Sequence, residues 1–176
     1  MQRPIYLIGF MGSGKTTLGK KLAQTLKVPF VDLDLEIVEK IGMTIPAYFD
    51  IYGEEEFRKI EREVLSLTAG LTGVISTGGG TPCFFNNMEW LLRHGLVVYL
   101  RHSPKSLWNR LNQSDVAKRP ALKGMTGEAL LSFIEDKLAA RAVYYNQAHL
   151  QVDQINIGIE EMVSIIQQHQ LTLDEN

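Results

Sequence analysis

The chain has 176 residues, 45% of them hydrophobic and 22% charged, which suits one folded domain spanning residues 1–176. Its formal net charge of -2 excludes a strongly basic surface, so neither nucleic acid nor an anionic membrane is an expected partner. No apolar run approaches ~18 residues and no signal peptide precedes the first strand, so we expect a cytoplasmic protein, which we take to be a monomer.

The first predicted strand, Pro4–Ile8, leads into a glycine-rich segment that opens a predicted helix over Lys15–Leu26. Positions 9–17 fit the phosphate-loop pattern G-x-x-x-x-G-K-[ST]. Glycines let several backbone N–H groups converge on an anion, and the helix N-terminus adds partial positive charge. We therefore expect a nucleoside triphosphate here, with Lys15 at its β- and γ-phosphates and Thr16 as a ligand of Mg²⁺. The predicted nucleotide-binding residues are Gly12, Ser13, Gly14, Lys15, Thr16 and Thr17.

A second strand is predicted at Val28–Val31, and two carboxylates follow it at Asp32 and Asp34. If the backbone stays extended, both carboxylates point to one side of the sheet edge while Leu33 turns inward. They could then hold Mg²⁺ through water and accept a proton from an attacking hydroxyl. A helix N-cap at Asp32 or Asp34 is an equally good interpretation of the same residues.

Helical segments are predicted from there to Thr68, and the charges between residues 54 and 63 are dense. Glu54 and Arg58 stand one turn apart in the favourable order for an ion pair, and a solvated face explains most of these charges. Arg58 lies nearest the apolar stripe and could instead clamp a carboxylate with two N–H groups. The stripe comprises Phe57, Ile60 and Val64.

The third predicted strand, Gly73–Ser76, ends just before three successive glycines at positions 78–80. Such a run exposes backbone N–H groups, so we expect Gly79 and Gly80 to contact a ligand. No aspartate ends this strand, so a metal would depend on Asp32 and Asp34 instead. Cys83 is the only cysteine, which excludes an internal disulfide, and we expect it to be a small buried side chain.

The rest of the chain continues to alternate strands with helices. This alternation predicts a three-layer α/β/α domain with a five-stranded parallel sheet, whose ligands bind at the carboxyl ends of the strands. The four histidines show no ligand spacing, and we assign them no chemistry. The remaining predicted elements are a helix over Asn86–Arg93, a strand at Leu96–Leu100, helices over Ser103–Leu111 and Gly127–Asn146, a strand at Leu150–Val152 and a helix over Ile159–Gln168.

A polar segment over residues 112–124 interrupts this pattern and carries Lys118, Arg119 and Lys123. A basic loop of that length predicts a mobile lid that closes on phosphates, with Arg119 as the arginine finger that contacts them. Arg110 before the lid and Arg141 after it are also candidates for the site. A role as ordinary surface charges explains both of them equally well.

Together these segments resemble the shikimate kinases, a family of P-loop kinases similar to the nucleoside monophosphate kinases. The resemblance runs from Ile5 to about Val152 and depends on the phosphate loop, Asp32-Leu33-Asp34, Gly53–Glu61, Gly78-Gly79-Gly80 and Arg119-Pro120. It implies phosphorylation of the 3-hydroxyl of shikimate by ATP with Mg²⁺, on the route to chorismate and the aromatic amino acids.

The resemblance also implies a role for each matching residue. Asp34 would bind the shikimate hydroxyls and act as a candidate base, and Lys15 and Arg119 would complete the catalytic set. The substrate contacts would be Asp34, Arg58, Gly79, Gly80 and Arg141; the metal ligands would be Thr16 and Asp32; and Arg110 and Arg119 would join the phosphate loop in binding the nucleotide.

The sequence departs from the family pattern at two places, and two alternative functions stay open. Ala121 stands where the family usually has a second leucine after the proline, and residues 153–156 lack the family's arginine or proline near adenine. A gluconate kinase would use the same loop for a different polyol acid. A GTP-dependent switch is the other alternative, because residues 50–53 match D-x-x-G. The sequence contains no N-K-x-D motif, however, which such a switch would use to recognise guanine.

Overall fold

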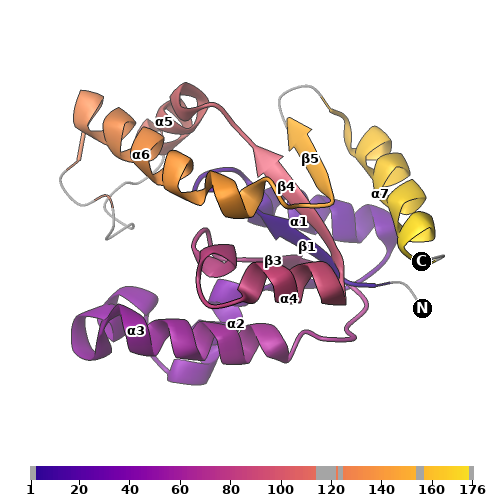
Figure 1. The fold of residues 1–176 in the computed structure, drawn as a ribbon, viewed down its shortest axis with the longest axis horizontal. Helices are drawn as coiled ribbons and strands as arrows, with labels where there is room; N and C mark the ends of the chain where they lie inside the picture. Colours follow the sequence, from indigo (N-terminus) through magenta and orange to yellow (C-terminus); the bar gives the residue numbers. More distant parts are fainter. Residues whose placement is uncertain (1–2, 114–121, 123–124, 154–156, 175–176) are drawn as a thin grey trace.

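The computed structural model describes residues 3–113, 122, 125–153 and 157–174. Five parallel strands form one sheet in the order β2-β3-β1-β4-β5 (Figure 1). The predicted five-stranded parallel sheet is confirmed. The strands are β1 (Ile5–Ile8), β2 (Phe30–Asp32), β3 (Val74–Ser76), β4 (Leu96–Arg101) and β5 (Leu150–Asp153).

Helices cover both faces of this sheet, so the three-layer architecture is confirmed as well (Figure 1). One face packs against α1 and α7, and the other against α2, α3, α4 and the carboxyl end of α6. None of the described helices is long and apolar enough to cross a membrane. The helices are α1 (Lys15–Leu26), α2 (Leu33–Ile41), α3 (Ile45–Ser66), the 3-10 turn η1 (Thr81–Cys83), α4 (Asn87–His94), α5 (Pro104–Asn112), α6 (Gly127–Tyr145) and α7 (Ile159–Asp174).

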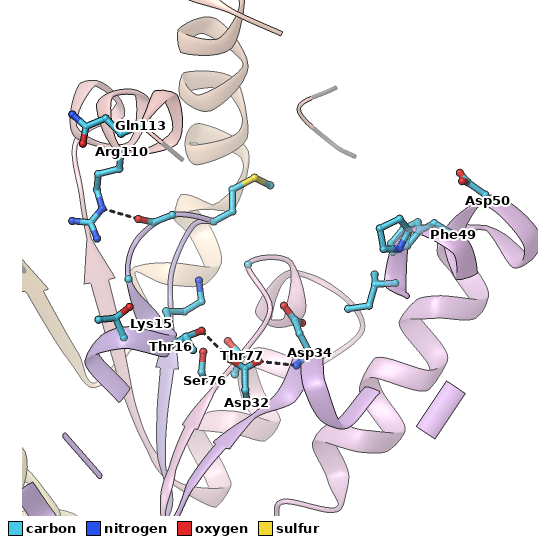
Figure 2. Close-up of a pocket in the computed structure, with 17 residues that line it drawn as sticks. Lys15, Thr16, Asp32, Asp34, Phe49, Asp50, Ser76, Thr77, Arg110 and Gln113 are labelled. Atoms are coloured by element: carbon cyan, nitrogen blue, oxygen red, sulfur yellow. Dashed lines mark hydrogen bonds between the residues drawn. The ribbon is translucent and has the colours of Figure 1, made fainter. Parts of the chain in front are cut away.

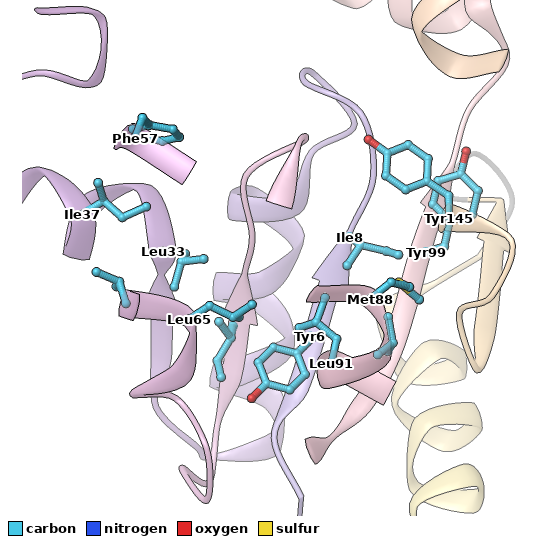
Figure 3. Packing of buried hydrophobic residues seen from close by; sticks show 13 residues of the cluster. Tyr6, Ile8, Leu33, Ile37, Phe57, Leu65, Met88, Leu91, Tyr99 and Tyr145 are labelled. Atoms are coloured by element: carbon cyan, nitrogen blue, oxygen red, sulfur yellow. The ribbon is translucent and has the colours of Figure 1, made fainter. Parts of the chain in front are cut away.

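The central strand β1 is buried over its whole length because both of its faces meet helices. Tyr6 and Ile8 point into the cluster formed with α2, α3 and α4, as Figure 3 shows. Ile5 and Leu7 point the opposite way, into the cluster formed with α1 and α7. Each fully buried side chain of this size contributes roughly 1.5–3 kcal/mol to stability, so β1 is a rigid base for the loop that follows it.

The second strand begins two residues later than the sequence suggested. Lys27 adopts the left-handed conformation that ends α1, and the Val28 N–H donates to the Ala23 carbonyl oxygen at 3.0 Å. Val28 therefore closes the helix, and β2 runs from Phe30 to Asp32. The chain reaches Asp32 at the end of this strand and enters α2 at once.

A crevice follows from the strand order. The chain leaves β1 toward α1 on one face of the sheet, whereas it leaves the neighbouring β3 through η1 toward α4 on the other face. Connections that diverge in this way open a gap at the carboxyl ends of the two strands, which is where open α/β sheets bind ligands. The phosphate loop and the three glycines border this gap from opposite sides.

Candidate functional site

The phosphate loop between β1 and α1 has a backbone that only glycines adopt easily. Gly9, Gly12 and Gly14 have φ angles of 144°, 79° and 90°. A Cβ at Gly9 would also lie 2.9 Å from the Leu100 carbonyl oxygen, so space excludes larger residues there. Gly14 is the N-cap of α1, which turns the positive end of the helix toward the loop.

Lys15 lies folded into its own loop. Its side chain is 8% exposed, and its ammonium group donates to the carbonyl oxygens of Gly9 at 2.8 Å and Phe10 at 2.9 Å. These bonds hold the cation at the centre of the loop. A bound phosphate would take the place of one or both carbonyl acceptors as the partner of Lys15.

A cavity of about 1070 Å³ opens beside the loop and reaches across the crevice (Figure 2). Lys15 and Thr16 lie on one side, Phe49 and Asp50 of α3 lie on the other, and Asp34 stands between them. The volume suits a nucleotide together with a small second substrate. Its walls consist of Met11, Gly12, Gly14, Lys15, Thr16, Thr17, Asp32, Asp34, Ile45, Pro46, Phe49, Asp50, Ser76, Thr77, Gly79, Arg110 and Gln113.

Asp32 connects the phosphate loop to α2. One carboxylate oxygen accepts from the Thr16 hydroxyl at 2.8 Å, and the other caps α2 by accepting from the Asp34 N–H at 3.2 Å (Figure 2). A hydroxyl and a carboxylate side by side at the cavity wall are oxygen ligands of the kind that Mg²⁺ prefers. In the part of the chain that the structure describes, no three His, Cys, Asp or Glu side chains form a metal cluster, so phosphates and water would supply the other ligands.

The prediction that Asp32 and Asp34 share one extended segment is wrong. The structure instead has the other interpretation of these residues, in which Asp32 is a helix N-cap. An aspartate that accepts from the N–H two residues later stabilises a helix start, and here this local bond wins over continuation of the strand. Asp34 consequently projects from the first turn of α2 and lines the cavity, whereas the Asp32 carboxylate bonds to Thr16.

Asp34 is a carboxylate poised to exchange a proton near neutral pH. Loss of hydration raises the pKa of its carboxyl group to about 6, and the charge of Asp32 adds to this rise, while Lys15 opposes it. The side chain still reaches water through the open cavity. It also lies against the glycine run, since a Cβ at Gly78 would be 3.0 Å from an Asp34 oxygen.

Arg58 is held in place by a network of which the sequence predicted only the ion pair with Glu54. One of its terminal nitrogens donates to Glu61 at 2.8 Å and the other donates to Glu54 at 2.9 Å. Glu61 is 1% exposed and also accepts from the Thr81 hydroxyl at 2.6 Å. The guanidinium lies 3.9 Å from the centroid of the Phe84 ring, so it is stacked as well as bonded.

The glycine run gives this guanidinium its space. A Cβ at Gly80 would lie 2.8 Å from an Arg58 nitrogen, although the Gly80 backbone itself, with φ at -94°, suits any residue. The position thus requires glycine because of the close arginine. Neither Arg58 nor Gly80 lines the main cavity, whereas the neighbouring Gly79 does.

Arg141 reaches the same glycine run from α6. It donates to the Gly79 carbonyl oxygen at 3.1 Å, and the buried Tyr145 hydroxyl donates to the same oxygen at 2.5 Å. Tyr145 was not predicted. Its spacing of four residues from Arg141, which places both on one helix face, was the only available signal.

The structure therefore brings together the substrate-side and nucleotide-side candidates. Asp34, Arg58 and Arg141 converge on the glycine run, and a Cβ at Gly79 would lie 3.2 Å from the Met11 N–H nitrogen of the phosphate loop. Arg110 joins from α5, where its Nε donates to the Gly12 carbonyl oxygen at 2.8 Å. Arg119 and most of the predicted lid lie outside the described residues.

Cys83 has no part in this chemistry. It is half-buried rather than fully buried, and it packs at the margin of the core cluster that includes Tyr145. Burial raises the pKa of its thiol to about 11, so the group stays protonated at neutral pH. A small packed side chain remains the best description of this residue.

A doubly wound parallel sheet with a phosphate loop at a crevice lined by Asp32, Asp34 and Arg110 defines a P-loop kinase of the α/β class. The family model for shikimate kinase matches residues 11–170. The chain therefore belongs to the shikimate kinase family.

Individual relatives agree with this assignment. The shikimate kinase of Bacteroides fragilis is 47% identical over 148 residues, which cover 82% of this chain and 81% of that protein. The crystal structure of shikimate kinase from Bacteroides thetaiotaomicron has a TM-score of 0.85 at 40% identity, covering 98% of both chains. Shikimate kinase from Acinetobacter baumannii in complex with shikimate has a TM-score of 0.83 at 35% identity, covering 98% of this chain and 94% of that one. A gluconokinase from Sinorhizobium meliloti, at 18% identity and a TM-score of 0.59, shares the fold alone.

Proposed function

We propose that the protein is a phosphotransferase that moves the γ-phosphoryl group of ATP to the 3-hydroxyl of shikimate, giving shikimate 3-phosphate and ADP. One observation carries this proposal: Asp34, Arg58 and Arg141 surround the glycine run that faces the phosphate loop across a single crevice. Membership of the shikimate kinase family supports the choice of acid, and the product would feed the route to chorismate.

The substrate dictates what the site has to supply. Shikimate presents a carboxylate at one end and three hydroxyls at the other. Arg58 and Arg141 would bind the carboxylate, and Asp34 would orient the attacking hydroxyl. As the new O–P bond forms and the bond to ADP breaks, the hydroxyl proton passes to Asp34. Lys15 neutralises charge on the transferring group, and no covalent enzyme intermediate is needed.

The remaining site residues belong to the same proposal. Thr16 and Asp32 would hold Mg²⁺, which when bound neutralises charge on the β- and γ-phosphates. Arg110 would contact the nucleotide and Arg119 the transferring phosphate. We further propose that residues 1–176 act as one kinase domain, as a monomer in the cytoplasm.

A substrate panel tests the proposed function directly. With ATP and Mg²⁺, shikimate should give rapid release of ADP, whereas gluconate should give less than about 1% of that rate because it lacks the ring that these groups fit. If the protein phosphorylates gluconate and not shikimate, its substrate is the polyol acid instead. Tight binding of GTP without any acceptor would favour a switch, although the D-x-x-G segment at residues 50–53 lies inside α3 rather than after a strand.

The pKa of Asp34 predicts how the reaction depends on pH. Its free-enzyme pKa of about 6 means that protonation removes the proton acceptor as the pH falls below 6. The value of kcat/KM for shikimate should therefore fall about tenfold per pH unit well below 6, and it should level off by about pH 7 to 8. A profile that stays flat between pH 5 and 8 would exclude Asp34 as the acceptor.

A further inference from the structure

A histidine outside the cavity supports the phosphate loop from behind. His102 directly follows β4, is 7% exposed, and places its Nε2 3.1 Å from the Ser13 carbonyl oxygen. We infer that His102 is a positioning residue for the nucleotide, which acts through the peptide between Ser13 and Gly14. The inference rests on the proposed function only in taking that nucleotide to be ATP.

The direction of the hydrogen bond shows which ring nitrogen is the donor. A carbonyl oxygen can only accept, so Nε2 has to carry a proton. The other nitrogen, Nδ1, lies 3.3 Å from the Ser106 hydroxyl in the first turn of α5. Ser106 is itself placed because its N–H donates to the Ser103 hydroxyl, the N-cap of that helix. The ring is thus oriented from one side by α5 and bonded on the other side to the loop.

The geometry of the peptide between Ser13 and Gly14 links this hydrogen bond to the ligand. The described part of the chain contains no cis peptide bond, and in a trans peptide the C=O and the N–H point in opposite directions. Ser13 is fully buried, whereas Gly14 lines the cavity. Holding the Ser13 carbonyl toward His102 consequently turns the Gly14 N–H toward the cavity, where a phosphate oxygen can accept it.

His102 differs from the other side chains that hold loop carbonyls. Lys15 bonds to Gly9 and Phe10, and Arg110 bonds to Gly12, but Lys15 and Arg110 also line the cavity. Both would exchange these partners when a nucleotide binds. His102 does not line the cavity, so its bond persists in the free and bound protein and keeps the loop in its binding conformation.

Two substitutions separate a positioning role from simple packing. The amide nitrogen of glutamine can occupy the place of the histidine Nε2, whereas that of asparagine ends near the place of Nδ1. His102→Asn should raise the dissociation constant for MgADP and the KM for ATP about five- to tenfold, the effect of one lost hydrogen bond to a carbonyl. His102→Gln should stay within twofold of the parent protein. Neither variant should change the KM for shikimate by more than twofold.

His149→Asn is the matched control. His149 also bonds to the backbone, where its Nδ1 accepts from the Val97 N–H, but it lies at the amino end of the sheet. This variant should leave MgADP affinity unchanged. If His102→Asn does not fold, Ser106→Ala provides the second test, because it removes the Ser106 hydroxyl from the ring without altering the ring itself. Its dissociation constant for MgADP should rise about two- to threefold.

Calorimetric titration with MgADP keeps this inference separate from the reaction. Unchanged affinity in His102→Asn, or equal losses for both substrates in the Asn and Gln variants, would overturn the positioning role. A parent protein that binds MgADP without phosphorylating shikimate would overturn the proposed function alone. A parent that does not bind MgADP would overturn both.

Discussion

Replacing Asp34 by asparagine should lower kcat by about 10²- to 10⁴-fold, the usual contribution of a positioned proton acceptor. The amide keeps the size of the side chain and can still hydrogen-bond to a hydroxyl, but it cannot take up the proton. Asp34 lies in the first turn of α2 and is not part of the loop that would cradle the phosphates, so the KM for ATP should change by less than about threefold. Release of ADP with both substrates saturating measures the effect.

Stability is the control for this variant, and its sign follows from the raised pKa. The folded protein holds the Asp34 proton up to a pH of about 6, whereas an unfolded chain releases it at a pH of about 3.9. The stabilising contribution of that proton is therefore full below about pH 4 and is lost as the pH rises through 6. At pH 7.5 the Asn variant should be at least as stable as the parent protein. Near-normal turnover in a well-folded variant would contradict the role of Asp34.

Arg58→Ala should raise the KM for shikimate by about 10- to 100-fold with a much smaller change in kcat. A charge-assisted contact to a carboxylate contributes roughly 1.5–3 kcal/mol, and it is made in the ground state and the transition state alike. The variant should also lose about 3 kcal/mol of stability, because Glu61 stays buried without its cationic partner.

A double variant distinguishes these two effects. Adding Glu61→Gln to Arg58→Ala removes the buried charge, so part of the stability should return while the KM for shikimate stays high. Lys59→Ala is the control on the same helix, since its ion pairs with Glu55 and Glu56 are exposed and weak. It should alter neither quantity. Recovery of the parental KM in the double variant would exclude Arg58 from substrate binding.

Local sequence was sufficient for much of this architecture. The phosphate loop is a continuous segment, and its glycines dictate its conformation whatever surrounds them. The alternation of elements likewise predicted the sheet. Two local errors had a shared cause: hydrogen bonds that end α1 and begin α2 took Val28 and the Leu33-Asp34 pair out of the extended segments that the sequence predicted.

The supporting residues could not be predicted because their partners are distant in the chain. Glu61 meets Thr81 across 20 positions, Tyr145 meets Gly79 across 66, and His102 meets Ser13 across 89. No periodicity encodes such contacts, and they exist only once the sheet has brought its strand ends together. Sequence motifs thus predict groups that would touch a ligand, while the structure shows the groups that hold them.

The two donors on the Gly79 carbonyl oxygen have a consequence for how the site accepts a substrate. Arg141 is engaged there in the structure, so under the proposed function it would have to turn away before both of its terminal nitrogens could bind the substrate carboxylate. The Tyr145 hydroxyl would still donate to the same oxygen, so no buried acceptor would be left without a hydrogen bond. Arg141 can therefore leave the Gly79 carbonyl oxygen at little cost in free energy, because that oxygen keeps a second hydrogen-bond donor.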